Sequence, residues 1–388
     1  MSKSAVREIV RRRRKEYVKG SKLEKSRILD EAVGLTGYHR KSLTRLFLRG
    51  IPVQKGAIRR PRESRYAPIL PHLKKLWAVT FYACGKRLQP FLPELLSVMK
   101  RFGEIYVTPT EESLLLSLSA ATMDRMLRGE RASMTIRGRT LTKPGTLLRS
   151  RIAVRTFAQW DEKEPGYFEL DLVGHCGGTG SGEFLYTLNM TDVYSGWVAL
   201  GGMKGRGERG TLLAIKAASE HIPFKVKGLD SDNDSSFINY HLARYCKRES
   251  IKLTRSREYK KNDQCHVEQK NWSVVRQFIG YKRFETDKEL SVLQELYPLL
   301  MAYHNFFHPM MRLSEKKREG SKVTKRYERS VTPYQRLIES NGHIDTETKE
   351  SLRQHYLSLN PMDLVKRIEA SLHRLGSIPN PTGKSQKR

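Results

Sequence analysis

The chain has 388 residues, of which 72 are Lys or Arg and 41 are Asp or Glu, giving a formal net charge of +31. With 38% hydrophobic residues, a chain of this length can bury a core in each of several domains. The excess of positive charge favours a polyanionic partner, and nucleic acid is the partner we expect. We expect no membrane association, because the sequence contains no apolar run of 18 residues and no signal peptide.

Several kinds of site are disfavoured by spacing. The four cysteines show no CxxC motif, which argues against a zinc site or a disulfide framework and favours a reducing cytoplasm, where we expect the protein to associate with the nucleoid. His304 and His308 are four residues apart, but no third ligand is near and Pro309 follows, so we favour aromatic packing over a metal. The glycine-rich residues 201–210 lack a P-loop ending and a GxGxxG motif, so we expect no nucleotide cofactor.

The N-terminal part of the chain predicts two helical modules, over residues 1–60 and 61–135. Residues 21–50 indicate two helices joined by a turn through Gly34 to Gly37, which is helix-turn-helix shape, although ordinary helical hairpins look similar. The second helix presents Arg40, Lys41 and Arg45, which we interpret as DNA-binding residues. Residues 112–131 repeat this pattern, and there DNA binding and plain helical packing both remain open.

Residues 136–160 lose all periodicity and are interpreted as a basic linker that lies along a phosphate backbone. Strand-like runs follow at 166–176, 183–195 and 196–205, and then a helix (210–221), a strand (224–232), a helix (236–250), a short strand (251–256) and two further helices. This order predicts a mixed sheet covered by helices, in a core over 161–310. Residues 311–388 are expected to form a basic, poorly periodic linker (312–330) and two helices broken at Pro361.

Three carboxylates occupy positions where an apolar residue is expected. Asp171 lies inside the strand-like run "YFELDLV", and Asp232 ends the strand "KVKGLDSD". Glu268 falls on the apolar side of a predicted helix, with Trp272, whereas Lys270, Ser273 and Arg276 fall on the polar side. Buried carboxylates are costly unless they are paired, and three of them more often converge on divalent cations. A pair of such ions is the usual arrangement for phosphodiester chemistry.

The spacing of these acids resembles a known family. Asp232 and Glu268 are separated by 35 residues, which is similar to the D,D-35-E signature of the retroviral-type integrase core, shared with the DDE transposases of bacterial insertion sequences. The runs "FELDLV", "SDNDSSFIN" and "SREYKKNDQCHVEQKNWSVVR" resemble the three segments that hold the family's acids. The likeness extends from about residue 20 to 340 and is densest between 160 and 280.

The resemblance implies an RNase H-like α/β core with a five-stranded mixed sheet, preceded by helix-turn-helix modules and followed by a helical region. It implies that Asp171, Asp232 and Glu268 are catalytic and bind two Mg²⁺ or Mn²⁺ ions. The implied activity is DNA 3′-end cleavage and strand transfer by a homodimer or higher multimer, with terminal repeats bound by the N-terminal helices. Basic and polar residues around the third acid would then contact DNA phosphates, namely Arg257, Lys260, Lys261, Asn262, Lys270 and Arg276.

Two departures from the family pattern keep alternatives open. Asp234 stands where the family usually has glycine, and Ser236 replaces a residue that is often acidic. Aspartate tolerates a left-handed backbone better than most residues, so the turn can survive, but the added charge could disturb metal or DNA binding. The alternatives are an inactive, transposase-derived DNA-binding regulator and a structure-specific nuclease of the same fold. Asp230 is the alternative second ligand, although it breaks the 35-residue spacing.

Overall fold

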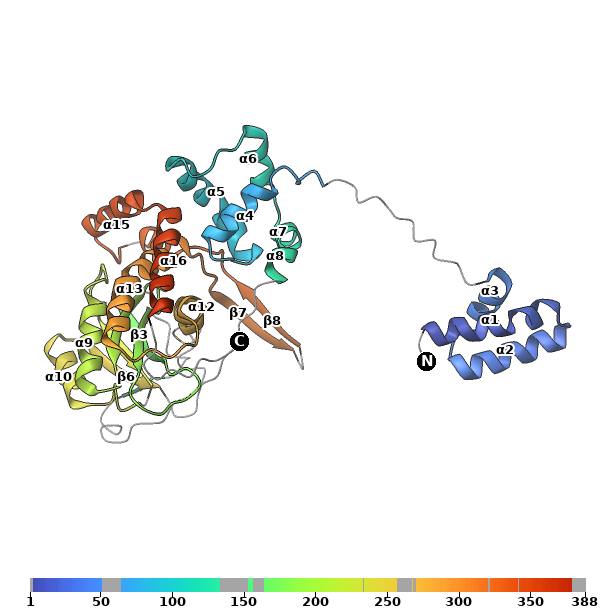
Figure 1. Cartoon of the computed structure of the whole chain (residues 1–388), viewed down its shortest axis with the longest axis horizontal. Coiled ribbons are helices and arrows are strands. Elements are labelled where there is room, and N and C mark those ends of the chain that lie inside the picture. The colour runs from blue at the N-terminus through green and yellow to red at the C-terminus, as the bar shows by residue number, and fades with distance from the viewer. Residues whose placement is uncertain are drawn as a thin grey trace. The chain divides into compact units, whose positions relative to one another are not determined.

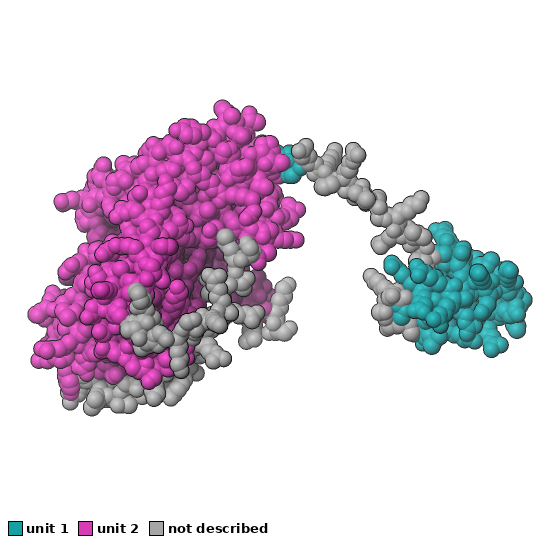
Figure 2. All heavy atoms as spheres, in the orientation of Figure 1, with its two compact units in different colours: residues 1–65 teal, residues 66–388 magenta. Residues whose placement is uncertain are grey.

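The computed structural model describes residues 3–50, 64–132, 153–155, 164–232, 234–256, 267, 270–319, 322–340 and 342–378. The chain divides into two compact units, residues 1–65 and 66–388, which are coloured separately in Figure 2. Unit 1 holds the first three helices. Unit 2 holds every other helix and strand that the structure describes, so the boundaries predicted at 135, 160 and 310 fall inside one unit.

Unit 1 is a three-helix bundle of α1 (Lys3–Lys19), α2 (Lys22–Thr36) and α3 (Arg40–Arg49). Ser21 begins α2 with a capping box, and Gly37 ends it in the left-handed region at φ 68°. The fully buried side chains of Val10, Leu43 and Phe47 form the centre of the bundle. The two helices predicted for residues 21–50 are therefore present, but the turn between them is formed by residues 37–39 and not by Gly34 to Gly37, because α2 continues to Thr36.

Unit 2 begins with a helical module of α4 (Leu70–Val79), α5 (Gly85–Arg101), α6 (Pro109–Leu116), α7 (Ala120–Met126) and α8 (Arg128–Ala132). Ser119 caps α7 by accepting a hydrogen bond from the backbone N–H of Thr122 at 3.2 Å. Gly85 allows α5 to approach α7 closely, because a Cβ at this position would lie 2.2 Å from the carbonyl oxygen of Ala120.

A six-stranded mixed sheet forms the centre of unit 2. Its strands are β1 (Ala153–Arg155), β2 (Tyr167–Gly174), β3 (Leu185–Asp192), β4 (Val198–Lys204), β5 (Gly228–Ser231) and β6 (Lys252–Ser256), in the order β1-β6-β5-β2-β3-β4. The β2–β3–β4 meander is antiparallel, whereas β5 pairs in parallel with both β2 and β6. The five predicted strands and their RNase H-like order are confirmed. The short strand β1, parallel to β6, is an addition within the predicted linker.

Helices cover both faces of this sheet (Figure 1). They are α9 (Glu208–Ser219), α10 (Tyr240–Arg248), the π-helix η3 (Asn271–Arg276), α12 (Gln277–Ile279) and α13 (Asp287–Phe307). Two adjacent glycines of β4 show which helix lies on which face. A Cβ at Gly201 would meet Ala214 of α9, and a Cβ at Gly202 would meet Tyr297 of α13. Because neighbouring residues in a strand point to opposite faces, α9 and α13 lie on opposite sides of the sheet.

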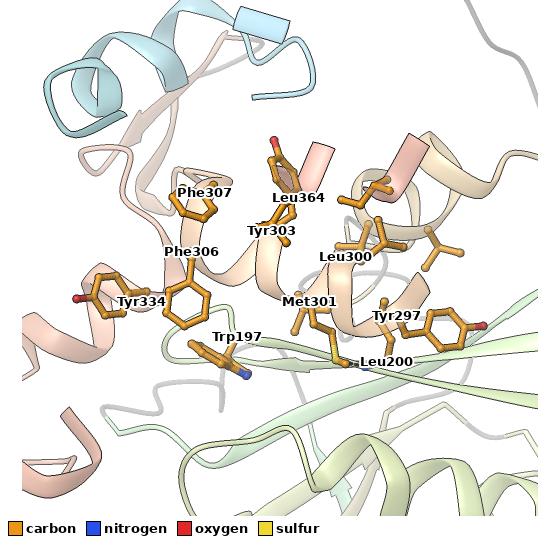
Figure 3. Packing of buried hydrophobic residues seen from close by; sticks show 14 of the residues in the cluster. Trp197, Leu200, Tyr297, Leu300, Met301, Tyr303, Phe306, Phe307, Tyr334 and Leu364 are labelled. Atoms are coloured by element: carbon orange, nitrogen blue, oxygen red, sulfur yellow. Dashed lines mark hydrogen bonds between the residues drawn. The ribbon is translucent and has the colours of Figure 1, made fainter. Parts of the chain in front are cut away.

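The buried face of α13 carries the largest apolar cluster. Figure 3 shows Met301 and Phe306 of this helix lying against Leu200 and Trp197 at the β4 edge of the sheet. Trp197 and Phe306 meet edge to face at 5.6 Å. Across the described residues, no helix is long and apolar enough to cross a membrane.

The C-terminal region differs from expectation between residues 312 and 330. This segment contains a regular antiparallel hairpin, β7 (Leu313–Glu319) and β8 (Lys322–Tyr327), where the sequence predicted a linker without periodicity. The sequence shows no alternation of apolar and polar residues here, because neither face of the hairpin is buried in an apolar core. The remaining helices are α14 (Pro333–Glu339), α15 (Thr346–Ser358) and α16 (Pro361–Ser377), and the predicted break at Pro361 is confirmed.

Asn305 of α13 completes the outer edge of β4. Its Oδ1 accepts a hydrogen bond from the Val198 N–H at 2.8 Å, and its Nδ2 donates to the Val198 carbonyl oxygen at 2.9 Å. Both residues are buried. The replacement Asn305→Ala leaves one backbone donor and one acceptor without these partners. We expect it to lower the free energy of unfolding by about 2–4 kcal/mol, measured by urea denaturation of the full chain.

The matched control is Gln294→Ala, at an exposed position of the same helix. We expect this control to change stability by less than about 0.5 kcal/mol. Equal midpoints for the two variants would show that the Asn305 amide does not hold the edge of the sheet.

Candidate active site

The pairing of β2 with β5 places four carboxylates on one face of the sheet. The two strands are parallel, with Glu169 opposite Asp230 and Leu170 opposite Ser231. Residues paired in parallel strands share a face, and the next positions along the two strands are Asp171 and Asp232. The register thus directs two sequence-predicted acids, 61 residues apart, to neighbouring positions: Asp171 in the middle of β2 and Asp232 just beyond the end of β5.

The inner pair of carboxylates is buried and hydrogen-bonded. Glu169 has no exposed surface and accepts a hydrogen bond from the Val267 N–H at 2.8 Å. Asp230 is 1% exposed and accepts a hydrogen bond from Thr254 Oγ1 at 2.5 Å. Asp230 is therefore held inside the sheet, whereas Asp171 and Asp232 lie one pair further along, where β5 ends beside the middle of β2.

Asp171 is half-buried and is oriented by two asparagines. Asn271 Nδ2 donates to Asp171 Oδ2, and Asn271 Oδ1 in turn accepts a hydrogen bond from Asn189 Nδ2 at 2.8 Å. Sequence reasoning did not identify either asparagine. Two signals could have done so: Asn189 is a lone amide in the apolar strand "LYTLNMTD", and Asn271 follows Glu268 at the spacing of one helical turn.

Asp232 is half-buried just beyond β5. Burial raises the pKa of this carboxyl to about 6, and the neighbouring charge of Asp234 adds to the effect. The backbone N–H of Asp234 donates to Asp232 Oδ1 at 3.0 Å, which fixes the side chain against the following turn.

The carboxylate of Asp234, which stands where the family usually has glycine, is paired with an arginine and hydrogen-bonded to a serine. Arg206 Nη1 donates to Asp234 Oδ2 at 2.8 Å, and Ser236 donates to Asp234 Oδ1 through both its N–H at 2.9 Å and its Oγ at 2.6 Å. Asp234 is not among the residues with positive φ, so the turn does not need the left-handed backbone that we expected there. The added carboxylate therefore organises the turn, with its charge offset by an arginine.

The segment that follows Val267 departs from the predicted helix. Residues 257–266, Glu268 and Gln269 lie outside the described residues, so the position of the third predicted acid is not described. Residues 271–276 form a π-helix, in which each residue turns through a smaller angle than in an α-helix. The sequence predicted Lys270 and Ser273 on the polar side of this segment and Trp272 on the apolar side. All three predictions are wrong, because Lys270 and Ser273 are buried and Trp272 is 54% exposed.

This burial affects two predicted DNA contacts. Lys270 is 5% exposed, and burial, together with the nearby Arg87 and Arg336, lowers the pKa of its ammonium to about 7. Arg276 is half-buried and donates to the carbonyl oxygens of Gly174 at 2.8 Å and Gly280 at 3.2 Å. Neither side chain therefore lies on an exposed polar face as expected.

The remaining predicted DNA-binding residues fall into two groups. Arg257, Lys260, Lys261 and Asn262 lie outside the described residues. In unit 1, Arg40 forms an ion pair with Asp30 and donates to Ser26 Oγ at 2.7 Å, so it ties α3 to α2. Lys41 and Arg45 are exposed one turn apart on α3, and their contact with DNA stays a prediction.

Two further predictions concern histidines and metals. His304 and His308 are buried, with ring centroids 4.8 Å apart, and both contact the ring of Tyr303, which agrees with aromatic packing. Within the described ranges, from which Glu268 is missing, no group of three His, Cys, Asp or Glu side chains is placed to hold a metal ion. Of the three acids predicted to bind metal, the structure describes Asp171 and Asp232.

Comparisons with known proteins place the chain in a family. No family model matches the sequence. An uncharacterized protein of Sinorhizobium fredii, y4rM, is 37% identical over 333 residues, which cover 82% of this chain and 91% of that protein. The chain therefore belongs to the same protein family as y4rM.

Solved structures similar to this chain include retroviral integrases. The HTLV-2 integrase catalytic core domain in complex with magnesium is 17% identical, with a TM-score of 0.28, over 38% of this chain and 91% of that chain. The BIV integrase catalytic core domain is 15% identical, with a TM-score of 0.28, over 49% and 98% of the two chains. A simian T-cell lymphotropic virus intasome is 14% identical, with a TM-score of 0.31, over 51% and 64%. The fold assignment comes from the strand order itself.

The burial of Asp232 should cost the protein stability. Because burial and the neighbouring charge of Asp234 disfavour the ionised form of Asp232, we expect Asp232→Asn to stabilise the fold at pH 7.5 in EDTA. Asparagine keeps the acceptor for the Asp234 N–H, so the turn should survive. The expected rise in melting temperature is a few degrees, corresponding to about 1–3 kcal/mol, measured by calorimetry.

The control is Asp287→Asn, which removes the same charge from a side chain that is 84% exposed. This variant should leave the melting temperature within about 1 °C of the parent. If Asp232→Asn instead destabilised the protein, the carboxylate would be a structural group and not one that the fold tolerates at a cost.

Proposed function

We propose that the protein is a DDE-type transposase that cleaves DNA at 3′ ends and transfers the strand to target DNA. One observation carries this proposal: the segment on either side of position 268 contacts the acidic strand. Val267 N–H donates to Glu169, and Asn271 donates to Asp171, across about 100 residues of sequence. Glu268 is next to Val267, so we assign it as the third acid beside Asp171 and Asp232.

The residues fit a hard divalent cation. Asp171, Asp232 and Glu268 offer only carboxylate oxygens, which are the donors that Mg²⁺ and Mn²⁺ prefer. A bound pair of ions would supply activation of the attacking hydroxyl and stabilisation of the leaving oxygen. The protein's part is to hold the donors in place: Asn189 and Asn271 orient Asp171, and the Asp234–Arg206 pair fixes the turn after Asp232.

DNA is the proposed substrate and partner. The net charge of +31 suits a polyanion, and the exposed Lys41 and Arg45 of α3 suit the recognition of terminal repeats by unit 1. We assign Arg257, Lys260, Lys261 and Asn262, which precede the third acid, to the DNA strand at the site. A homodimer or higher multimer on paired DNA ends, acting at the nucleoid, completes the proposal.

The inactive regulator is not favoured. This alternative was considered because the extra charge of Asp234 could disturb metal or DNA binding. The Asp234 carboxylate is paired with Arg206 at 2.8 Å, so its charge is offset. No described feature favours a structure-specific nuclease over strand transfer.

The direct test is strand transfer with a pre-cleaved oligonucleotide taken from the DNA that flanks the gene, in the presence of Mg²⁺ or Mn²⁺. We expect Asp171→Asn, Asp232→Asn and Glu268→Gln each to lower the rate by about 10³-fold or more, because each removes a ligand worth several kcal/mol in the transition state. Products are measured on denaturing gels.

The control for this assay is Glu220→Gln, an exposed acid at the end of α9, which should retain the parent rate. Full activity of Asp232→Asn combined with loss of activity in Asp230→Asn would move the second ligand to Asp230. Full activity of all three principal variants would refute the proposed chemistry.

Metal binding offers a separate test that does not depend on the DNA sequence. Ions that bind only the folded chain raise its stability, by about 2.7 kcal/mol at 100 times the dissociation constant. We expect Mn²⁺ to raise the melting temperature of the parent chain and of Asp287→Asn, and to do so far less for Asp171→Asn. An equal rise for all three proteins would place the ion elsewhere.

A further inference from the structure

The β7–β8 hairpin is the most strongly charged element of unit 2 that the proposed active site does not use. Residues 312–329 contain eight Lys or Arg and three Glu. Among the described elements, each strand of the hairpin packs extensively only against the other. In Figure 1 the hairpin lies at the margin of unit 2, apart from the layered core. Nothing in the described part of the chain therefore explains the hairpin as packing.

The base of the hairpin is firmly attached to the core. Arg312 donates through Nη1 to the Tyr194 carbonyl oxygen at 2.9 Å and through Nη2 to the Val193 carbonyl oxygen at 3.2 Å, in the turn after β3. Met310 and Val331 pair across the two ends through backbone hydrogen bonds of 2.9 and 3.2 Å. The hairpin is thus a defined arm on a rigid base.

The two faces of the arm differ in charge. On one face, here called the paired face, Lys317 forms an ion pair with Glu319 at 2.9 Å, and Arg326 forms one with Glu315 at 3.3 Å. The opposite face, here called the basic face, presents Leu313, Val323, Lys325 and Tyr327. Leu313, Val323 and Tyr327 are 43%, 41% and 50% exposed.

The basic face keeps its positive charge. Among the described residues Lys325 forms no ion pair, and the register sets Lys316 opposite Lys325 and Arg318 opposite Val323. None of the strand positions that the register assigns to this face is acidic. Exposed apolar and aromatic groups beside the unpaired Lys325 suit a polyanion whose surface also offers apolar contacts.

We propose that the basic face of the β7–β8 hairpin is a binding surface for duplex DNA. The inference rests on the proposed function for the identity of its partner. The major groove, about 12 Å wide, admits a two-stranded β-ribbon. Two strands about 5 Å apart meet this limit, and seven residues of strand reach about 24 Å along the DNA. In this proposal the ammonium group of Lys325 contacts phosphates, while Val323 and Tyr327 contact base edges or sugars.

The test compares two lysines of the same hairpin in the full chain. Lys325→Ala removes a charge from the basic face, and Lys317→Ala removes the same charge from the paired face. Binding of a fluorescent 30-base-pair duplex is measured by anisotropy in EDTA between about 0.05 and 0.3 M salt. EDTA keeps this readout independent of catalysis.

We expect Lys325→Ala to weaken binding about 5–10-fold at 0.1 M salt and to reduce the salt slope by about 1, because one phosphate contact is lost. Lys317→Ala should weaken binding less than about twofold, since its charge is already offset by Glu319. Tyr327→Ala should weaken binding and leave the salt slope unchanged, because it removes no charge.

Equal losses for the two lysine variants, or no loss for Lys325→Ala, would overturn the inference. Sedimentation without DNA provides a further check: if Lys325→Ala or Tyr327→Ala dissociated a multimer, the basic face would be a contact between copies of the chain, and the DNA assignment would fall. If strand transfer failed while the two lysines differed as expected, the hairpin would remain a DNA-binding arm and only the proposed chemistry would be lost.

Discussion

The parallel pairing of β2 with β5 is the constraint on which the site depends. Its register sets Glu169 beside Asp230, and so directs Asp171, in the middle of β2, and Asp232, just beyond β5, to neighbouring positions. A shift by one residue would turn one of these two acids to the opposite face of the sheet. Both inner acids are held by hydrogen bonds, Glu169 to the Val267 N–H and Asp230 to Thr254 of β6. Burial of Asp232 beside the charge of Asp234 disfavours its ionised form, a cost that structures tolerate at functional sites.

The strands were predictable because they are buried on both faces. Apolar residues predominate in runs such as "YFELDLV", and β3 is buried at seven of its eight positions. The two strand acids were predictable for the same reason, since a carboxylate in such a run stands out. The positions of Asp171 and Asp232 in the sequence could not show that the two side chains are neighbours, because the register of β2 on β5 depends on contacts between residues about 60 apart in sequence.

Two features escaped sequence reasoning for physical reasons. Lys270 precedes the π-helix over 271–276, and three steps of about 100° place it only about 60° from the buried Val267, so it belongs to the apolar side of the segment and not to the polar side predicted for it. The β7–β8 hairpin has no apolar face to bury, so no alternation of apolar and polar residues marks its strands in the sequence. Only the pairing of the two strands shows that Lys317 and Lys325, similar in sequence context, occupy different electrostatic surroundings.

A strained turn of the helical module of residues 64–132 packs against α12, beside the central sheet. Phe81 and Tyr82, between α4 and α5, have φ values of 43° and 66°, a backbone that side chains other than glycine rarely adopt. Phe81 packs edge to face on Phe278 of α12 at 4.5 Å, and its carbonyl oxygen accepts a hydrogen bond from Gln277 at 3.1 Å. These contacts hold the strain in place. Because α12 continues directly from the segment that touches Asp171, the same contacts tie the module to the acidic site, so DNA held by this module would meet the acids in a fixed register.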